Sequence, residues 1–111
     1  MRCVAVEGLP ADPLAAAARF HAEFVPGLAA AAQDLLLVFP PADHTHHGWR
    51  LAAVQMLARA GAPRRVNAVA SASESAIAAA ERYLGQQAPG LTGQYLPLDD
   101  AGAGAVLQAG A

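Results

Sequence analysis

The chain has 111 residues, of which 55% are apolar and only 14% are charged, and its formal net charge is −2. This length fits one small domain, and a near-neutral charge without a basic face argues against a nucleic-acid partner. All seven basic residues are arginines. The absence of lysine excludes chemistry that depends on a Schiff-base or P-loop lysine.

The cysteine content and the N-terminus bear on the compartment. Cys3 has no second cysteine to pair with, and the first residues lack the pattern of a secretory signal. The apolar run 35–39 is far too short to span a bilayer. We therefore expect a cytoplasmic protein with no membrane partner.

The first third of the chain predicts a strand and a helix. Residues 2–6 resemble a short buried strand. Asp12 followed by Pro13 is a helix start, because aspartate caps the first turn and proline fits its first position. We expect this helix to cover 12–24 and to end at Pro26-Gly27.

The middle of the chain predicts a buried strand and a long helix. A possible short helical turn at 28–32 precedes the apolar run 34–39, which is typical of a central parallel strand. The helix from Asp43 to about Ala60 begins near 44–47 and is apolar around most of its surface. Such a helix needs burial on two sides. Its expected polar stripe consists of Arg50, Gln55 and Arg59, and its expected apolar face is Trp49, Ala52, Ala53, Met56, Leu57 and Ala60.

The last third predicts two more strands around a helix. Residues 64–70 are apolar on both strand faces, and Ser71 to Glu74 has the spacing of a capping box before a helix that ends near Leu84. Residues 93–98 are the last strand, and the tail, about 101–111, is expected to be flexible or to form a weak helix. The alternation predicts an α/β fold: one domain, 1–111, with a small, mostly parallel four-stranded sheet flanked by helices. The first strand would be an open edge.

Two motifs resemble the short-chain dehydrogenase/reductase family. Arg65-Val66-Asn67-Ala68-Val69-Ala70 is similar to its R-V-N-x-V-x strand, and 92–99 is similar to its T-G-x-x-L-x-x-D segment. The helix before the first motif, with Leu57-Ala58 and Ala62-Pro63, fits the same register. The resemblance implies half of a Rossmann-like fold, the C-terminal half of that family, in a truncated form.

The same resemblance implies that the family's chemistry is missing. The chain has no G-x-G-x-x-G-like spacing for a dinucleotide. Alignment on Leu57-Ala58 places Asp43 and His47 in the slots of the catalytic tyrosine and lysine. The serine-bearing loop is shortened to 40–42, and Ser71-Ala72 replaces the P-G that borders the nicotinamide. We therefore expect no cofactor and no catalytic residues of the family type.

The family also implies a dimer, because its subunits commonly associate through the two long helices beside the active-site strand. The apolar helix from Asp43 to Ala60 is an independent reason to expect the same here. The expected interface residues are Trp49, Leu51 and Val54 on that helix, with Phe20 and Phe24 on the helix before it.

One polar cluster in the sequence has side chains suited to binding or catalysis. It consists of Asp43, His44, His46 and His47. It follows a parallel strand, where open α/β sheets bind ligands, and its imidazoles could bind a small ligand, transfer protons or hold a metal. The alternative is structural, with Asp43 as a helix cap and solvated histidines. No second cluster of ligands accompanies it, so we expect no metal site.

Two functions follow from these observations. The first is a non-catalytic domain of the short-chain dehydrogenase type that self-associates as a homodimer or binds a larger enzyme or regulator. The alternative is a small enzyme or a ligand or metal binder that uses the residues Asp43 to His47.

Overall fold

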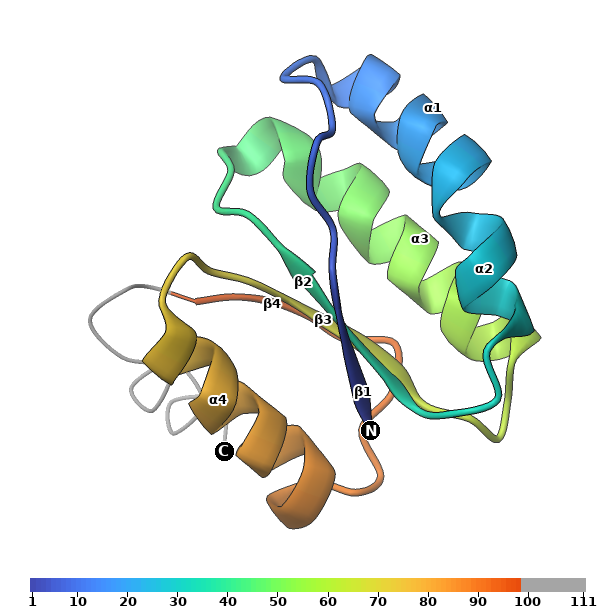
Figure 1. Ribbon diagram of the computed structural model, residues 1–111, viewed down its shortest axis with the longest axis vertical. Coiled ribbons are helices and arrows are strands. Elements are labelled where there is room, and N and C mark those ends of the chain that lie inside the picture. The colour runs from blue at the N-terminus through green and yellow to red at the C-terminus, as the bar shows by residue number, and fades with distance from the viewer. Residues whose placement is uncertain (99–111) are drawn as a thin grey trace.

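The computed structural model describes residues 1–98. The expected tail and the pair Asp99 and Asp100 lie outside the described residues. Four parallel strands form one sheet in the order β1-β2-β3-β4 (Figure 1). They are β1 (Arg2–Ala5), β2 (Leu35–Phe39), β3 (Val66–Ala70) and β4 (Tyr95–Pro97). The α/β fold with a small parallel sheet is confirmed.

Helices cover both faces of the sheet. One face carries α1 (Pro13–Glu23), α2 (Val25–Ala30) and α3 (His47–Ala60), and the other carries α4 (Glu74–Arg82), as Figure 1 shows. A short 3₁₀ turn, η1 (His44–His46), precedes α3, and a π turn, η2 (Tyr83–Gln87), follows α4. The predicted cap at Asp12 is present, because its side chain accepts from the amide of Ala15. The capping box from Ser71 to Glu74 is not formed: Ser73 caps α4 by accepting from the amide of Ala76, and Ser71 accepts from the amide of Ser73.

The connection through α4 differs from the two before it. The strands follow one another in chain order and all run parallel, yet α4 lies on the face opposite to α1 and α3 (Figure 1). Its crossover must therefore have the opposite hand to the first two. Crossovers between parallel strands are right-handed in about 98% of cases, so a sheet with both hands is unusual.

The central strand β2 shows why both faces need cover. Leu35, Leu37 and Phe39 point toward α1 and α3, whereas Leu36 and Val38 point toward α4. Four of its five residues are buried. The continuous apolar run therefore follows from burial on two sides, as the sequence predicted.

Two local predictions were wrong. The strand β1 is mostly exposed, with only Val4 half-buried, because it is an edge strand that pairs with β2 alone. Pro26-Gly27 also does not end the helical segment. α1 ends at Glu23, and α2 begins directly at Val25 with Pro26 in its first turn, where proline removes no needed hydrogen bond.

The buried face of α3 also differs from the prediction. Its buried residues are Arg50, Ala53, Val54, Leu57 and Ala58, whereas Met56 is 46% exposed. A helix that is apolar all round does not define its own orientation from hydrophobicity. The sequence therefore did not indicate which face of α3 packs against the sheet.

The two family-like motifs bond to each other at the amino ends of β3 and β4. The side chain of Asn67, 1% exposed, donates to the carbonyl of Leu91 (2.9 Å) and accepts from the amide of Gln94 (3.1 Å). The hydroxyl of Thr92 accepts from the amide of Val66 (3.0 Å). Gly93 lies between them with φ of 76°, a left-handed conformation that favours glycine.

The adjacent arginines bind helix ends on opposite faces of the sheet. Arg64 donates to the last carbonyls of α2, those of Leu28 and Ala31, both at 2.7 Å. Arg65 donates to the carbonyl of Leu84 (3.0 Å) and pairs with Asp34 through Nε (3.0 Å). Both arginines therefore stabilise the negative ends of helices.

Among residues 1–98, no helix has both the length and the apolar character required to cross a membrane.

We predict a pH-dependent contribution of Asp34 to stability. Hydrogen bonds from the backbone and side chain of Arg65 lower the pKa of Asp34 from its ordinary 3.8. Because the folded-state pKa is depressed, the stabilisation is present above about pH 4 and is lost as the pH falls below that. Asp34→Asn should reduce the free energy of unfolding in urea by about 1 kcal/mol at pH 7. The difference from wild type should shrink below pH 4, and a difference independent of pH would contradict this account.

Candidate functional site

A cavity of about 320 Å³ lies at the carboxyl end of β1 and β2. This is the edge at which open α/β sheets bind ligands. The loop after β1, the loop after β2 and the first turn of α3 form its walls. The lining residues are Gly8, Leu9, Pro10, Ala11, Ala16, Pro40, Pro41, Ala42, Asp43, His46, Trp49 and Arg50.

Asp43 is exposed and serves as the cap of η1. Its Oδ1 accepts hydrogen bonds from the hydroxyl and the amide of Thr45, the latter at 2.9 Å. These two bonds lower the pKa of the Asp43 carboxyl group, so it is ionised at neutral pH. The carboxylate therefore contributes a fixed negative charge to one wall of the cavity.

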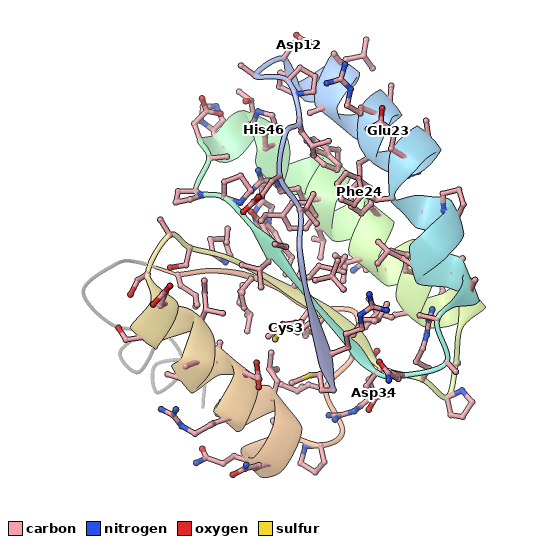
Figure 2. The ribbon with its side chains drawn as sticks, in the orientation of Figure 1. Cys3, Asp12, Glu23, Phe24, Asp34 and His46 are labelled. Atoms are coloured by element: carbon pink, nitrogen blue, oxygen red, sulfur yellow. The ribbon has the colours of Figure 1, made fainter. Side chains whose placement is uncertain are left out.

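His46 is 9% exposed and joins the loop after β1 to α3 (Figure 2). Its Nδ1 accepts from the indole N–H of Trp49 (3.0 Å), and its Nε2 lies 3.0 Å from the carbonyl of Ala11. The indole can only donate and a carbonyl can only accept. The ring must therefore be the neutral tautomer with its proton on Nε2, and both nitrogens are occupied.

The predicted cluster does not converge on one point. His44 and His47 are exposed, and the ring of His47 packs against Tyr95 with 5.2 Å between centroids. His46 alone is buried among the three histidines. Within residues 1–98, no three side chains of histidine, cysteine, aspartate or glutamate come close enough together to hold a metal ion.

Arg50 is the buried functional group that the sequence interpretation missed. It is 3% exposed, and its Nη1 donates to the carbonyl of Pro40 (2.9 Å) and to the hydroxyl of Tyr95 (3.0 Å). Its Nε is fully buried without a hydrogen-bond partner. The only ion pairs among residues 1–98 join Arg19 to Glu23 and Arg65 to Asp34. Within that part of the chain, the guanidinium of Arg50 has no carboxylate partner.

Aromatic rings offset part of the cost of this buried charge. The guanidinium carbon of Arg50 lies 4.6 Å from the ring centroid of Phe39, and 5.9 and 6.0 Å from those of Trp49 and Tyr95. A cation–π contact contributes about 0.5–2 kcal/mol. Burying an ion costs several kcal/mol even after relaxation. The charge of Arg50 is therefore only partly compensated by the groups around it.

The expected interface residues occupy two different environments. Phe20 and Val54 are fully buried in the chain's own core and have no surface to offer a partner. Phe24, Trp49 and Leu51 are half-buried. On α3, the exposed residues are His47, Gly48, Ala52, Gln55, Met56, Arg59 and Ala60. The homodimer stays a prediction, and any interface on α3 must use this outer face.

Cys3 was expected to be a buried small hydrophobe, but it lies on the exposed edge strand facing α4 (Figure 2). Its thiol donates to a carboxylate oxygen of Glu81 at 2.6 Å. Partial burial and the neighbouring carboxylate raise the pKa of the thiol to about 12. Since the thiolate is the nucleophilic form, Cys3 is a poor nucleophile at neutral pH.

Comparison with known proteins identifies the family. The family model described as SDR-like, short chain dehydrogenase-like protein, matches residues 4–98. Because this match covers most of the chain, the protein belongs to the short-chain dehydrogenase-like family. No curated protein matches the chain, and no solved structure matches it.

The two residues that the sequence alignment places in the family's catalytic slots have other contacts in the structure. Asp43 is held by Thr45 as a helix cap, and His47 is exposed and packs against Tyr95.

We predict that His46 stabilises the fold. His46→Ala should lower the free energy of unfolding by about 2 kcal/mol, because the N–H of Trp49 and the carbonyl of Ala11 lose their partner. His44→Ala is the matched control, since His44 is exposed, and it should change stability by less than about 0.5 kcal/mol. Equal effects of the two variants in urea denaturation would show that the contacts of His46 contribute nothing.

Proposed function

We propose that this domain is a non-catalytic member of its family that acts by self-association. The proposal rests on the alignment that puts Asp43 and His47 where the family has its catalytic tyrosine and lysine. It is supported by their contacts, because Asp43 caps η1 and His47 packs against Tyr95. The chain also has no glycine-rich dinucleotide motif. This chain keeps the sheet and the helices that the family pattern describes.

The outer face of α3 supports association with a second copy of the chain. Gly48, Ala52 and Met56 are exposed along one stripe of this helix, and Arg59 is its only charged member. Small side chains let two helices approach closely, and Met56 adds a flexible apolar contact. A twofold dimer would place α3 of one protomer against α3 of its partner, because such an interface uses the same patch on both.

Low surface charge favours the same proposal. Only 14% of the residues are charged, compared with about 25% in typical globular domains. Exposed positions of α1 and α3 are consequently occupied by alanine and by large apolar groups such as Leu14, which is 82% exposed. Covering part of this surface in a dimer removes apolar area from water.

We predict that the wild-type chain sediments at micromolar concentration with about twice its monomer mass of 11.3 kDa. Ala52→Glu should convert it to a folded monomer, because a charge would be buried against the same residue of the partner. Ala78→Glu on α4 is the matched control, an exposed helical alanine on the other face of the sheet, and should leave the dimer intact. A monomeric wild type, or equal dissociation of both variants, would contradict self-association.

We also predict that the chain does not bind NADH or oxidise it. The double variant Asp43→Tyr with His47→Lys restores both catalytic residue types and should remain inactive, because the phosphate-binding glycines are still missing. NADH fluorescence measures binding, and absorbance at the nicotinamide band measures turnover with a panel of carbonyl compounds. Saturable NADH binding by the wild-type chain would contradict the proposal.

A further inference from the structure

We propose that the cavity at the carboxyl end of β1 and β2 binds a small organic monocarboxylate, held by the guanidinium of Arg50. The site is independent of the outer face of α3, so it does not depend on self-association. The proposal assigns a class of ligand to a chain in which Asp43 and His47 are predicted at the catalytic positions of the family.

The first argument is the unsatisfied charge of Arg50. A guanidinium is ionised at every ordinary pH and carries five N–H donors. Nη1 is used by Pro40 and Tyr95, and Nε has no partner. No acceptor within residues 1–98 serves Nε, so the guanidinium can still gain an acceptor from a ligand. Because Arg50 is 3% exposed and lines the cavity, that acceptor would reach it from within the cavity.

Arg64 shows what a structural arginine looks like in the same chain. Its Nε is also buried without a partner, but its Nη1 binds two carbonyls at the C-terminus of α2, where the helix end is negative. Arg50 instead lies in the first turn of α3, where the helix end is positive. The local field at Arg50 therefore favours an anion, whereas Arg64 already has its compensating dipole.

The walls of the cavity determine the kind of anion. Leu9, Pro40 and Trp49 provide apolar surface beside the charge of Arg50. A planar carboxylate matches one edge of a guanidinium in a bidentate pair. The ionised side chain of Asp43 also lines the cavity, and its charge disfavours a second negative charge on the ligand. A monocarboxylate with a small apolar body therefore fits better than a phosphate dianion, and about 320 Å³ is enough for such a molecule.

The single tryptophan of the chain is a built-in reporter, because Trp49 lines the cavity. Its fluorescence can be titrated with isobutyrate, with the uncharged isobutyramide, and with inorganic phosphate, at constant ionic strength set by sodium chloride. We expect a saturable change with isobutyrate, no saturable change with isobutyramide, and binding of phosphate at least tenfold weaker. Equal responses to isobutyrate and isobutyramide would overturn the role of charge, and tighter binding of phosphate would overturn the carboxylate assignment.

Variants then test Arg50 itself. Arg50→Gln should abolish the isobutyrate response, and Arg50→Lys should weaken it at least tenfold, because an ammonium cannot form the planar fork. Arg82→Gln is the matched control, since it removes the same charge from an exposed position of α4 on the other face of the sheet, and it should leave the affinity unchanged. An unchanged response in a folded Arg50→Gln variant would overturn the proposal.

A measurement on the unmodified chain covers the case in which both Arg50 variants unfold. The arginine Nε–H resonances in a ¹⁵N–¹H spectrum report directly on each guanidinium. Isobutyrate should shift one of the seven arginine signals strongly and with the same saturation as the fluorescence. Uniform small shifts of all arginine signals, or none, would overturn binding at Arg50.

Discussion

The side chain of Asn67 is the contact on which the second half of this fold depends. It is buried in β3 and makes one donated and one accepted hydrogen bond to the loop 91–94. These side-chain bonds reinforce the backbone bonds from Gly93 to Val66 and from Ala68 to Gln94 at the entry to β4. The hydroxyl of Thr92 completes the same arrangement from the other side. β4 has only three residues, and the crossover that leads to it has the opposite handedness to the two before it. Local side-chain bonds to the backbone therefore determine where β4 begins, because an unpaired buried amide or carbonyl would cost about 1–3 kcal/mol.

The same line of residues ties the sheet to the helices on both faces. Arg64 binds the end of α2, and Arg65 joins Asp34 to the end of the helical segment that contains α4. The polar side chains of the motif that resembles the dehydrogenase family thus form hydrogen bonds to backbone groups. This explains how the family pattern can extend over residues 4–98 in a chain whose sequence predicts Asp43 and His47 in the catalytic slots. The pattern is a requirement of the sheet, and the chemistry depends on residues elsewhere.

Much of this fold could be predicted from the sequence, because its signals are local. The run 35–39 indicated a strand buried on both faces, and Asp12-Pro13 indicated a helix start, since these depend on neighbouring residues only. The segment Ser71 to Glu74 indicated the start of α4, although the cap is Ser73 and not Ser71. The orientation of α3 could not be predicted from its even apolar composition, so Arg50 was assigned to a solvent stripe. Its spacing of three, four, seven and eight residues from Ala53, Val54, Leu57 and Ala58 was the available signal. The open edge at β1 was expected from the sequence, but the exposure of its side chains was not, because the apolar run 3–6 is typical of a buried strand. The candidate cavity required both loops to meet in space, which no local pattern records.

Native-state hydrogen exchange on Asn67→Ala, compared with Asn67→Asp, tests the role of this side chain most directly. The aspartate variant keeps an acceptor for the amide of Gln94, whereas the alanine variant keeps neither bond. In Asn67→Ala, the amides of Ala68 and Gly93, which bond across β3 and the loop before β4, should lose protection by local opening. The amide of Val6, which bonds to β2, should change only with global stability, and Asn67→Asp should show a smaller local effect. Uniform loss of protection at all three amides, or no loss at Ala68 and Gly93, would contradict the account.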